Sequence, residues 1–471
     1  MRASRLLGAT IALTLLLAPT GCASLKDRLT ERPASARTVA LPAPARVTLD
    51  NGLTLLVVER HNLPIVSVSA VVRAGEAYVP VGSAGLATLT AELLRRGTQG
   101  RSAPEIAEAI DFIGGSIESS AGLDSSSASL SVLKKDLDTG LALFSDVLLR
   151  PTFPDAELKR LKEEYRASLT ASLDDADDVL RRAFQQQLLP GHPYGRQTTL
   201  SSLNGLTREA VQRFYQTYYR PNNTFMAVVG DITPAEAKAR FERAFGGWKA
   251  QAVTAPSVPA PGRGGDRRVV FVEMPVNQSF IRLGNVAAAR NTPDYFPLAV
   301  MNHILGGSFT SRLNQTLRDQ QGLAYGAGSG LGMNLHGGTF FAGLNTKTES
   351  TDQAIKGLLG ELERLQKERV SAEELAFAKD YLTGSFPLRF ETNGDLAREV
   401  VNVEFFGLPE DYLATYRERV RAVTAEDIQR VAKQYLATDA YQLVVVGKAG
   451  VEDVLEGYGA VDELEKGALI Q

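Results

Sequence analysis

Residues 206–232 read LTREAVQRFYQTYYRPNNTFMAVVGDI, and residues 423–449 read VTAEDIQRVAKQYLATDAYQLVVVGKA. The two stretches match at a constant offset of 217, which pairs Thr207 with Thr424 and places Val-Val-Gly near the end of each. In each copy the threonine can cap an amphipathic helix, and a short turn leads from that helix into an apolar β-run. Two long copies so far apart indicate a duplicated domain, because solenoid repeats recur about every 20–50 residues.

Strand-like runs and amphipathic helices come in mixed order within each half. Helices gathered in blocks between paired strands favour an α+β fold with a mostly antiparallel sheet in each half. We expect residues 47–58 and 65–73 to form a hairpin, with Asp50-Asn51-Gly52 as a turn inside the first run. A Ser-rich alternating run follows at 116–133, and helices are expected at 85–96, 103–113, 137–149 and 154–173.

Residues 250–266 (AQAVTAPSVPAPGRGGD) separate the two copies. This stretch has neither a helical nor a strand period, and its density of Pro and Gly is typical of a linker. It divides the chain into an N-terminal domain at 46–249 and a C-terminal domain at 267–461, followed by a tail at 462–471.

The start of the chain has the pattern of a bacterial export signal. Arg2 and Arg5 precede an apolar run of 12 residues, 6–17. That run is too short to cross a bilayer as a helix, which takes about 20 residues. We therefore expect residues 1–21 to be a signal peptide.

The small residues before Cys22 resemble a bacterial lipobox, in which the cysteine is lipidated and becomes the mature N-terminus. The Ala-, Pro- and Arg-rich sequence after it predicts a flexible tether over 22–45. By resemblance to known lipoproteins, Ala23 favours an outer-membrane lipoprotein of the cell envelope that faces the periplasm. Plain secretion with an incidental Cys22 is the alternative.

Composition excludes several classes of function. The chain has 51 Lys+Arg against 54 Asp+Glu, so no basic footprint favours a nucleic-acid partner. One Cys excludes a disulfide within the chain and a Cys-based zinc site. The four His lie far apart, so a metal site is poorly supplied with ligands. We expect His192 to fix a loop, His303 to pack in a core or an interface, and His336 to be exposed.

Motifs spread over both halves resemble the M16 family of metallopeptidases (pitrilysin, insulinase and mitochondrial processing peptidase). The resemblance covers about residues 47–459 and implies two homologous LuxS/metallopeptidase-like domains. Single motifs are weak, and their order and spacing make the match specific. They are VTLDNGL (47–53), residues 82–98, PTF (151–153), GHPYG (191–195), MNHILGG (301–307), residues 311–328 and FGLP (406–409).

Active members of that family carry an inverted zinc motif, H-x-x-E-H, in a helix that begins Gly-Leu-Ala and ends near Gly-Thr. Two His on one face bind zinc, and the Glu serves as general base. Here residues 85–98 read GLATLTAELLRRGT. The resemblance places Thr88 and Glu92 where the two His would be and Ala91 where the Glu would be.

The family's third ligand, a Glu on a later helix, falls near Ser168, and the nearest acids are Glu163 and Glu164. We therefore expect no metal site in this chain. An atypical site built from Glu92, Glu164 and a His is the alternative.

A second family feature is present. Residues 312–325 read RLNQTLRDQQGLAY, which is similar to the element that supplies an Arg and a Tyr opposite the zinc. Gly322 is placed to end the helix, so that Arg318 lies near its last turn and Tyr325 on the next strand. By resemblance, Arg318 and Tyr325 bind the substrate backbone and help to stabilise the tetrahedral oxyanion.

A lost zinc motif beside a retained Arg and Tyr is the pattern of a non-catalytic M16 subunit. We expect a partner chain with an intact H-x-x-E-H motif to supply zinc, and a peptide or unfolded polypeptide to be the substrate. This chain would need no cofactor of its own and would attach to the membrane through its lipid. A structural or peptide-binding protein with no part in hydrolysis is one alternative, and an active peptidase with an atypical metal site is another.

Overall fold

The computed structural model describes residues 43–262, 264 and 266–471. The signal peptide expected at 1–21, Cys22 and most of the tether expected at 22–45 lie outside these residues.

The N-terminal half is built on a mixed sheet. In the described chain the sheet has the order β1-β2-β6-β3-β5-β4. Only β2 and β6 pair in parallel, and the other neighbours are antiparallel. The strands are β1 (Ala45–Thr48), β2 (Thr54–Glu59), β3 (Ile65–Val72), β4 (Ser116–Ala121), β5 (Ser126–Leu133) and β6 (Thr224–Gly230).

The hairpin predicted between residues 47–58 and 65–73 is wrong. β1 and β2 form a hairpin of their own, with Gly52 at φ 85° in the turn, as expected for that turn. Strand β6 lies between β2 and β3 and pairs with both. A strand so distant in sequence leaves no local signal, which is why adjacency along the chain misled the prediction.

The C-terminal half has a sheet of the same design, with the order β12-β7-β11-β8-β10-β9. Strand β7 is parallel to β11 and β12, and the remaining pairs are antiparallel. Together the two sheets confirm the α+β class. The strands are β7 (Arg268–Glu273), β8 (Gln278–Ala287), β9 (Ala324–Met333), β10 (Gly338–Lys347), β11 (Gln442–Gly447) and β12 (Val461–Glu463).

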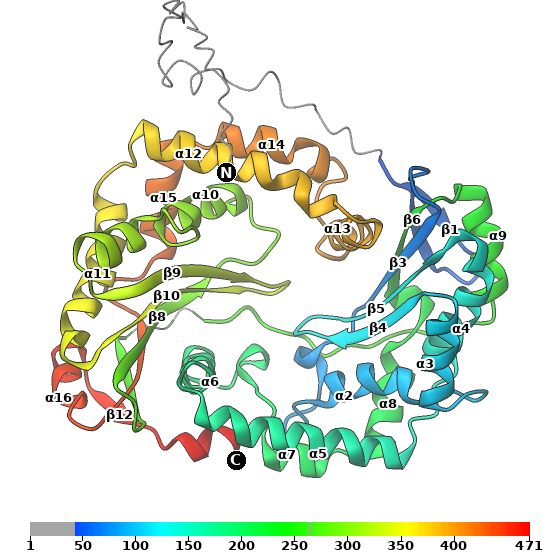
Figure 1. Ribbon diagram of the computed structural model, residues 1–471, viewed down its shortest axis with the longest axis horizontal. Helices are drawn as coiled ribbons and strands as arrows, with labels where there is room; N and C mark the ends of the chain where they lie inside the picture. Colours follow the sequence, from blue (N-terminus) through cyan, green and yellow to red (C-terminus); the bar gives the residue numbers. More distant parts are fainter. Residues whose placement is uncertain (1–42, 263, 265) are drawn as a thin grey trace, which may run out of the picture. The chain divides into compact units, whose positions relative to one another are not determined.

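Helices cover both sheets (Figure 1). The N-terminal half contributes α2 (Leu86–Leu93), α3 (Ala103–Phe112), α4 (Leu137–Leu149), α5 (Asp155–Ala171), α6 (Ala176–Leu188), α7 (Leu200–Gly205), α8 (Arg208–Tyr218) and α9 (Pro234–Phe245). The C-terminal half contributes α10 (Tyr295–Leu305), the π-helix η7 (Asn314–Gln320), α11 (Thr351–Lys367), α12 (Ala372–Ser385), α13 (Asn393–Phe405), α14 (Tyr412–Ala422), α15 (Ala425–Tyr435) and α16 (Glu452–Leu455).

The sequence repeat corresponds to one helix and one central strand in each half. Helix α8 leads into β6, and α15 leads into β11. Each helix begins as predicted, because the Thr207 hydroxyl accepts a hydrogen bond from Ala210 N (3.2 Å) and the Thr424 hydroxyl accepts one from Asp427 N (3.1 Å). The duplicated element is therefore the one that carries the centre of each sheet.

The two halves exchange helices. Helix α13 of the C-terminal half packs on β3 and β6 of the N-terminal sheet, and α6 of the N-terminal half packs on β8 and β11 of the C-terminal sheet. Each exchanged helix joins the core of the other half. The buried members around α13 include Leu396, Ala397, Val400, Val401, Leu56, Val58, Val71, Ala227 and Val229, and those around α6 include Val179, Leu180, Ala183, Phe184, Val270, Val272, Val444 and Val446.

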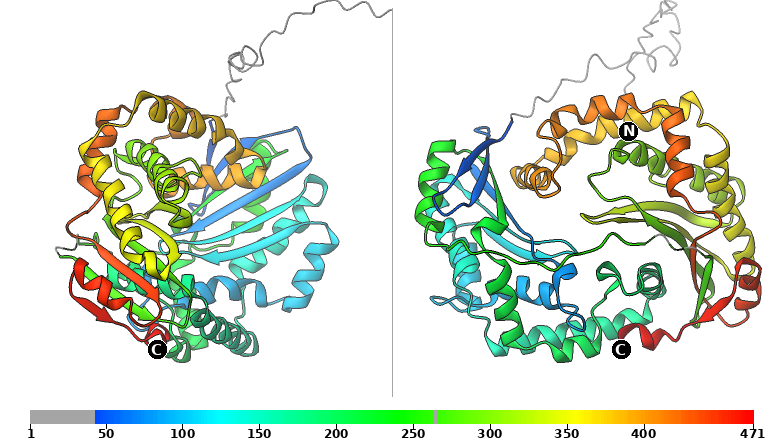
Figure 2. Two further views of the ribbon diagram at one scale, coloured as in Figure 1. Left: turned by 60° about the vertical axis from the view of Figure 1, so that its left-hand side comes forward. Right: turned by 180° about the vertical axis from the view of Figure 1, so that it is seen from behind.

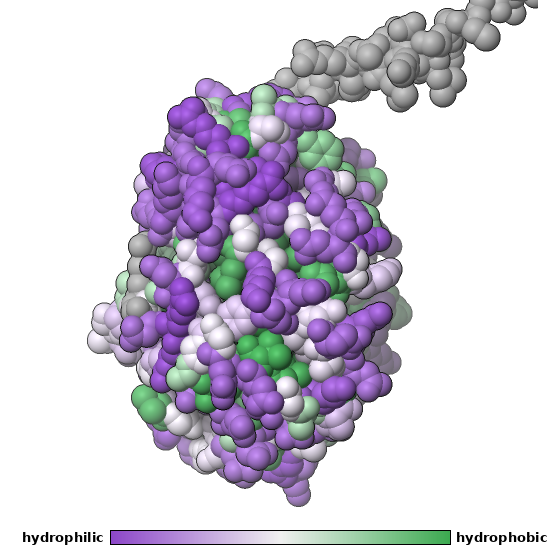
Figure 3. Space-filling model, turned by 90° about the vertical axis from the view of Figure 1, so that its left-hand side faces the viewer, coloured by the Kyte–Doolittle hydropathy of each residue, from purple (hydrophilic) through white to green (hydrophobic). Residues whose placement is uncertain are grey.

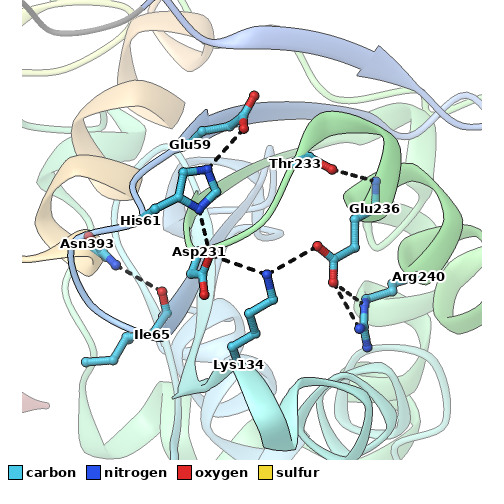
Figure 4. A network of polar contacts seen from close by, with 9 residues as sticks. All are labelled: Glu59, His61, Ile65, Lys134, Asp231, Thr233, Glu236, Arg240 and Asn393. Carbon is cyan, nitrogen blue, oxygen red and sulfur yellow. Dashed lines mark hydrogen bonds and ion pairs between the residues drawn. The ribbon is translucent and has the colours of Figure 1, made fainter.

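Polar contacts at the β2–β3 turn hold α13 in place. Arg60 Nη1 donates to Phe390 O (3.1 Å), and Asn393 Nδ2 donates to Ile65 O (3.1 Å). The same turn carries His61 (Figure 4). Its Nδ1 lies 2.6 Å from Asp231 Oδ1, which Lys134 Nζ also reaches at 3.3 Å. The network therefore ties the turn that anchors α13 to the end of β6.

The network predicts a pH-dependent contribution to stability. Hydrogen bonds with Asp231 and Glu59 raise the pKa of His61. The stabilisation that protonated His61 gives to the fold is therefore complete below the pKa of His in the unfolded chain, about 6.5. It is lost as pH rises through the raised pKa of His61 in the folded protein. We expect His61→Gln to lower the melting temperature at about pH 5.5 and to leave it nearly unchanged at about pH 8.5.

Arg240→Gln is the matched control in the same network. Arg240 pairs with Asp138 (2.6 Å) and donates to Glu236 (3.0 Å), and these two contacts raise the pKa of its guanidinium further. The effect of its loss should therefore be similar at both pH values. If His61→Gln lowered the melting temperature equally at both pH values, protonated His61 would not be the source of the pH-dependent stabilisation.

The segment between α9 and β7 contains no helix or strand within its described residues, 246–262, 264, 266 and 267. Figure 2 shows it from behind, running from the N-terminal half to the C-terminal half. At the other end of the chain, residues 462–471 include most of β12 and a 3-10 helix in which Leu469 and Ile470 are buried.

The face that carries α11 and α16 is mainly hydrophilic and shows only separate apolar areas (Figure 3). Ion pairs along α11 contribute to this character. Lys356 pairs with Asp352 (2.7 Å) and Lys367 with Glu363 (2.7 Å), each one turn apart. No helix formed by the described residues is both long enough and apolar enough to cross a membrane.

Candidate functional site

Helix α2 carries the residues at the positions of the zinc motif. The Glu76 carboxylate caps the start of this helix: Oε1 accepts from Thr88 N (2.8 Å) and from the Thr88 hydroxyl (2.7 Å), and Oε2 accepts from Gly85 N (3.0 Å). A carboxylate is favourable there because the helix N-terminus is positive and has free N–H groups. Thr88 is thus engaged in a structural hydrogen-bond network.

Glu92, one turn further on, is engaged as well. It accepts a hydrogen bond from the Tyr165 hydroxyl of α5. Burial and this hydrogen bond raise the pKa of Tyr165, so the phenol stays a donor at neutral pH. Ala91 is fully buried, and Ser168 is exposed on α5. Thr88, Ala91 and Glu92 are therefore engaged within the fold, whereas Ser168 faces solvent.

Arg318 and Tyr325 come together as predicted. Arg318 lies in the last turn of the π-helix η7, and Gly322 (φ 63°) ends this helix before β9. The Arg318 Cζ atom is 5.6 Å from the centre of the Tyr325 ring. Tyr325 is 93% exposed, so its phenol is available to a ligand.

Phe309 is a third member that sequence reasoning missed. The Arg318 Cζ atom lies 4.2 Å from the centre of its ring, and Phe309 is 69% exposed. The guanidinium therefore lies against two exposed aromatic rings, an arrangement stabilised by cation–π attraction. Its Nη1 is buried and has no hydrogen-bond partner among residues 43–262, 264 and 266–471.

The beginning of this helical segment is anchored to α12. Arg312 Nε and Nη2 donate to the two carboxylate oxygens of Glu374 (2.7 and 3.0 Å). Burial alone would raise the pKa of Glu374, but the hydrogen bonds from Arg312 and Ser371 lower it to about 2. A bidentate pair of this kind fixes geometry as well as charge. The Arg318 side chain therefore extends from a rigidly held segment.

Two family models match the chain in succession. "Insulinase (Peptidase family M16)" matches residues 55–201, and "Peptidase M16 inactive domain" matches residues 205–382. Together they cover more than half of the chain; the second match begins just before α8 of the N-terminal half and ends within α12 of the C-terminal half. The chain belongs to the M16 peptidase family.

Two relatives match this chain over nearly their whole length. An uncharacterized zinc protease of Mycobacterium tuberculosis is 27% identical over 430 residues, which is 89% of this chain and 96% of the relative. An uncharacterized zinc protease of Bacillus subtilis is 26% identical over 419 residues, with coverage of 86% and 98%.

Solved structures agree on the fold. The crystal structure of a peptidase M16 inactive domain from Pseudomonas fluorescens has a TM-score of 0.82 and 25% identity, and it covers 87% of this chain and 99% of that one. The structure of a protease from Helicobacter pylori has a TM-score of 0.80 at 22% identity, with coverage of 86% and 100%. Two M16-type domains, each a sheet packed with helices, are thus the architecture of this chain.

The two acids of the alternative metal site are engaged with other side chains. Glu92 accepts from Tyr165, and Glu164 pairs with Arg160; the neighbouring Glu163 accepts from Arg166 (3.0 Å). Within the part of the chain that the structure describes, no three His, Cys, Asp or Glu side chains are grouped so as to hold a metal ion. The residues on α2 and α5 therefore do not fit a zinc ion.

The remaining His residues have structural partners. His192 Nδ1 accepts from Tyr194 N (3.1 Å) and its Nε2 lies 2.9 Å from Pro259 O, so it fixes a loop as predicted. His303 is buried and stacks on Tyr381 with ring centres 4.6 Å apart, and burial lowers its pKa.

The expectation of an exposed His336 is wrong. It is half-buried because its Nε2 lies 3.3 Å from the Tyr78 hydroxyl and its backbone N donates to Tyr194.

Proposed function

We propose that this chain is the non-catalytic, substrate-binding subunit of a two-chain M16 zinc peptidase. The observation that carries the proposal is the partly exposed Arg318 guanidinium between the exposed rings of Tyr325 and Phe309. A charged group and an exposed phenol placed in this way suit a ligand from outside the chain. The positions of the zinc motif, in contrast, are satisfied internally.

The pair is suited to binding a peptide backbone next to the bond that is cut. The guanidinium and the phenol are fixed hydrogen-bond donors for a carbonyl oxygen, and they bind it more tightly as it becomes an oxyanion. The partner chain, with its intact H-x-x-E-H motif, supplies zinc and the activated water. It also supplies an edge strand that receives the substrate as an added strand.

The place of the complex follows from the start of the chain. Lipidation of Cys22 would hold the subunit on the outer membrane facing the periplasm. Peptides or unfolded polypeptides of that compartment are the substrate class that this position makes available.

The test begins with the purified protein alone. We expect no stoichiometric zinc by elemental analysis and no cleavage of unfolded casein. Adding the M16 chain with intact H-x-x-E-H that co-purifies with this protein, or that an adjacent reading frame encodes, should give peptidase activity that a chelator abolishes.

The alternatives predict different results. A stable homodimer without such a companion would favour a structural or peptide-binding role. Zinc near one per chain, with activity in the isolated protein, would favour an atypical metal site. Either result would overturn the proposed function.

A further inference from the structure

We propose that Asn314 is the positioning residue of the Arg318–Tyr325 pair: its amide fixes both the strand that presents Tyr325 and the loop that packs on Arg318. This inference rests on the proposed function, because it concerns the same two side chains. Asn314 is the first residue of η7, and it is 7% exposed.

Tyr325 is presented by an irregularity in the sheet. Ala324 pairs with Thr346 and Ala327 pairs with Leu344, so that Tyr325 and Gly326 together lie opposite the single residue Asn345. Two residues opposite one define a β-bulge, which bends a strand and redirects its side chains. Strand β9 is also the edge strand of its sheet, so that among the described residues its outer side has no neighbouring strand. The direction of the Tyr325 side chain therefore depends on what holds the bulge.

Asn314 holds the bulge from its open side. Its Oδ1 accepts a hydrogen bond from Ala327 N (3.0 Å), the first backbone donor after the bulge. The end of the bulge nearer the N-terminus is held at Leu323. Its N donates to Leu317 O (2.8 Å), and its O accepts from the Thr346 hydroxyl (2.7 Å). Without Asn314, the next bond on the outer side of β9 after the bulge would be that from Ser329 N to Gly306 O (3.1 Å), two residues further on.

The second group of the same amide reaches the loop before the helix. Asn314 Nδ2 donates to Ser308 O (3.1 Å), the residue that precedes Phe309. Phe309 in turn packs its ring on the Arg318 guanidinium. One buried side chain thus connects the strand of Tyr325, the helix of Arg318 and the loop that supports Arg318.

A substitution that keeps the volume but removes the hydrogen bonds tests this role. In the two-chain complex, we expect Asn314→Leu to lower kcat by about 10-fold or more and to change KM by less than about 3-fold, because misplaced donors lose transition-state contacts first. Asn314→Asp keeps the acceptor for Ala327 N, and its kcat should lie between those of Asn314→Leu and the wild type.

Asn285→Leu is the matched control in the same half. Asn285 also bridges backbone groups through its amide, accepting from Ala437 N (3.0 Å) and donating to Tyr435 O (2.8 Å), far from the pair. Rates are compared per folded protein, with the folded fraction measured by circular dichroism. We expect the two Leu variants to lose similar melting temperature and only Asn314→Leu to lose kcat.

The outcomes separate this inference from the proposed function. If Arg318→Ala lowers kcat while Asn314→Leu behaves as Asn285→Leu does, the positioning role is wrong and the proposed function stands. If Arg318→Ala and Asn314→Leu both leave kcat unchanged, both are wrong. A kcat in Asn314→Asp as low as in Asn314→Leu would also count against the bond to Ala327.

Discussion

Substituting Arg318 by alanine is expected to lower kcat/KM of the proposed two-chain peptidase by about 10²-fold or more, and Tyr325→Phe is expected to have an effect of similar size. Each change removes a fixed donor from the developing oxyanion, and the loss of one such donor typically costs that factor. The measurement is steady-state cleavage of a fluorogenic peptide by the complex at matched subunit concentrations. Both variants should still fold, because Tyr325 is exposed and the Arg318 side chain is partly exposed.

Arg267→Ala provides the control for the loss of a cation–π contact. The Arg267 Cζ atom lies 5.7 Å from the Tyr441 ring in the same half of the chain, away from the candidate site. We expect this variant to keep the wild-type rate. Wild-type rates in both Arg318→Ala and Tyr325→Phe would remove the basis of the proposed role, and equal losses in the control would point to stability alone.

Separate expression of the two halves, residues 43–249 and 267–471, is expected to yield insoluble or unfolded protein in each case. Each isolated half would expose the sheet face that the other half covers with α13 or α6. Burial of Leu396, Ala397, Val400 and Val401 on α13 alone contributes on the order of 5 kcal/mol. That is comparable to the whole stability of an ordinary domain.

Co-expression of the same two fragments should restore a soluble complex, since the linker contributes no helix or strand in its described residues. The measurements are soluble yield, size-exclusion chromatography and thermal unfolding of each fragment and of the pair. A soluble half that unfolds cooperatively on its own, with no gain when the other is present, would contradict the expectation.

The predictions from sequence succeeded where a pattern was local. The capping Thr424 with its acidic first turn, and Gly322 at the end of η7, were predicted correctly because caps and left-handed glycines are properties of a few consecutive residues. The meeting of Arg318 and Tyr325 followed from the same local element. Its short spacing leaves few ways for the two side chains to separate.

The features that sequence did not predict depend on distant pairing. The position of β6 between β2 and β3 requires a strand from the far end of the half. The role of Phe309 depends on a loop that folds back over the helix, and the bulge at Tyr325 depends on its register with β10. The half-buried position of His336 arises because its hairpin packs on Tyr78 and Tyr194 of the other half.

The exchange of α6 and α13 also constrains the evolution of the sequence. Two similar halves, each of which packs one helix on the sheet of the other, have the connectivity of a domain-swapped pair joined into one polypeptide. Residues more than 300 positions apart, such as Val71 and Val400, therefore share one core, so that each limits the size of side chain that the other position can hold. The zinc-motif positions on α2 lie outside both exchanged helices. Mutations there leave the exchanged helices intact, so the residues at these positions can change while the architecture of two interlocked halves persists.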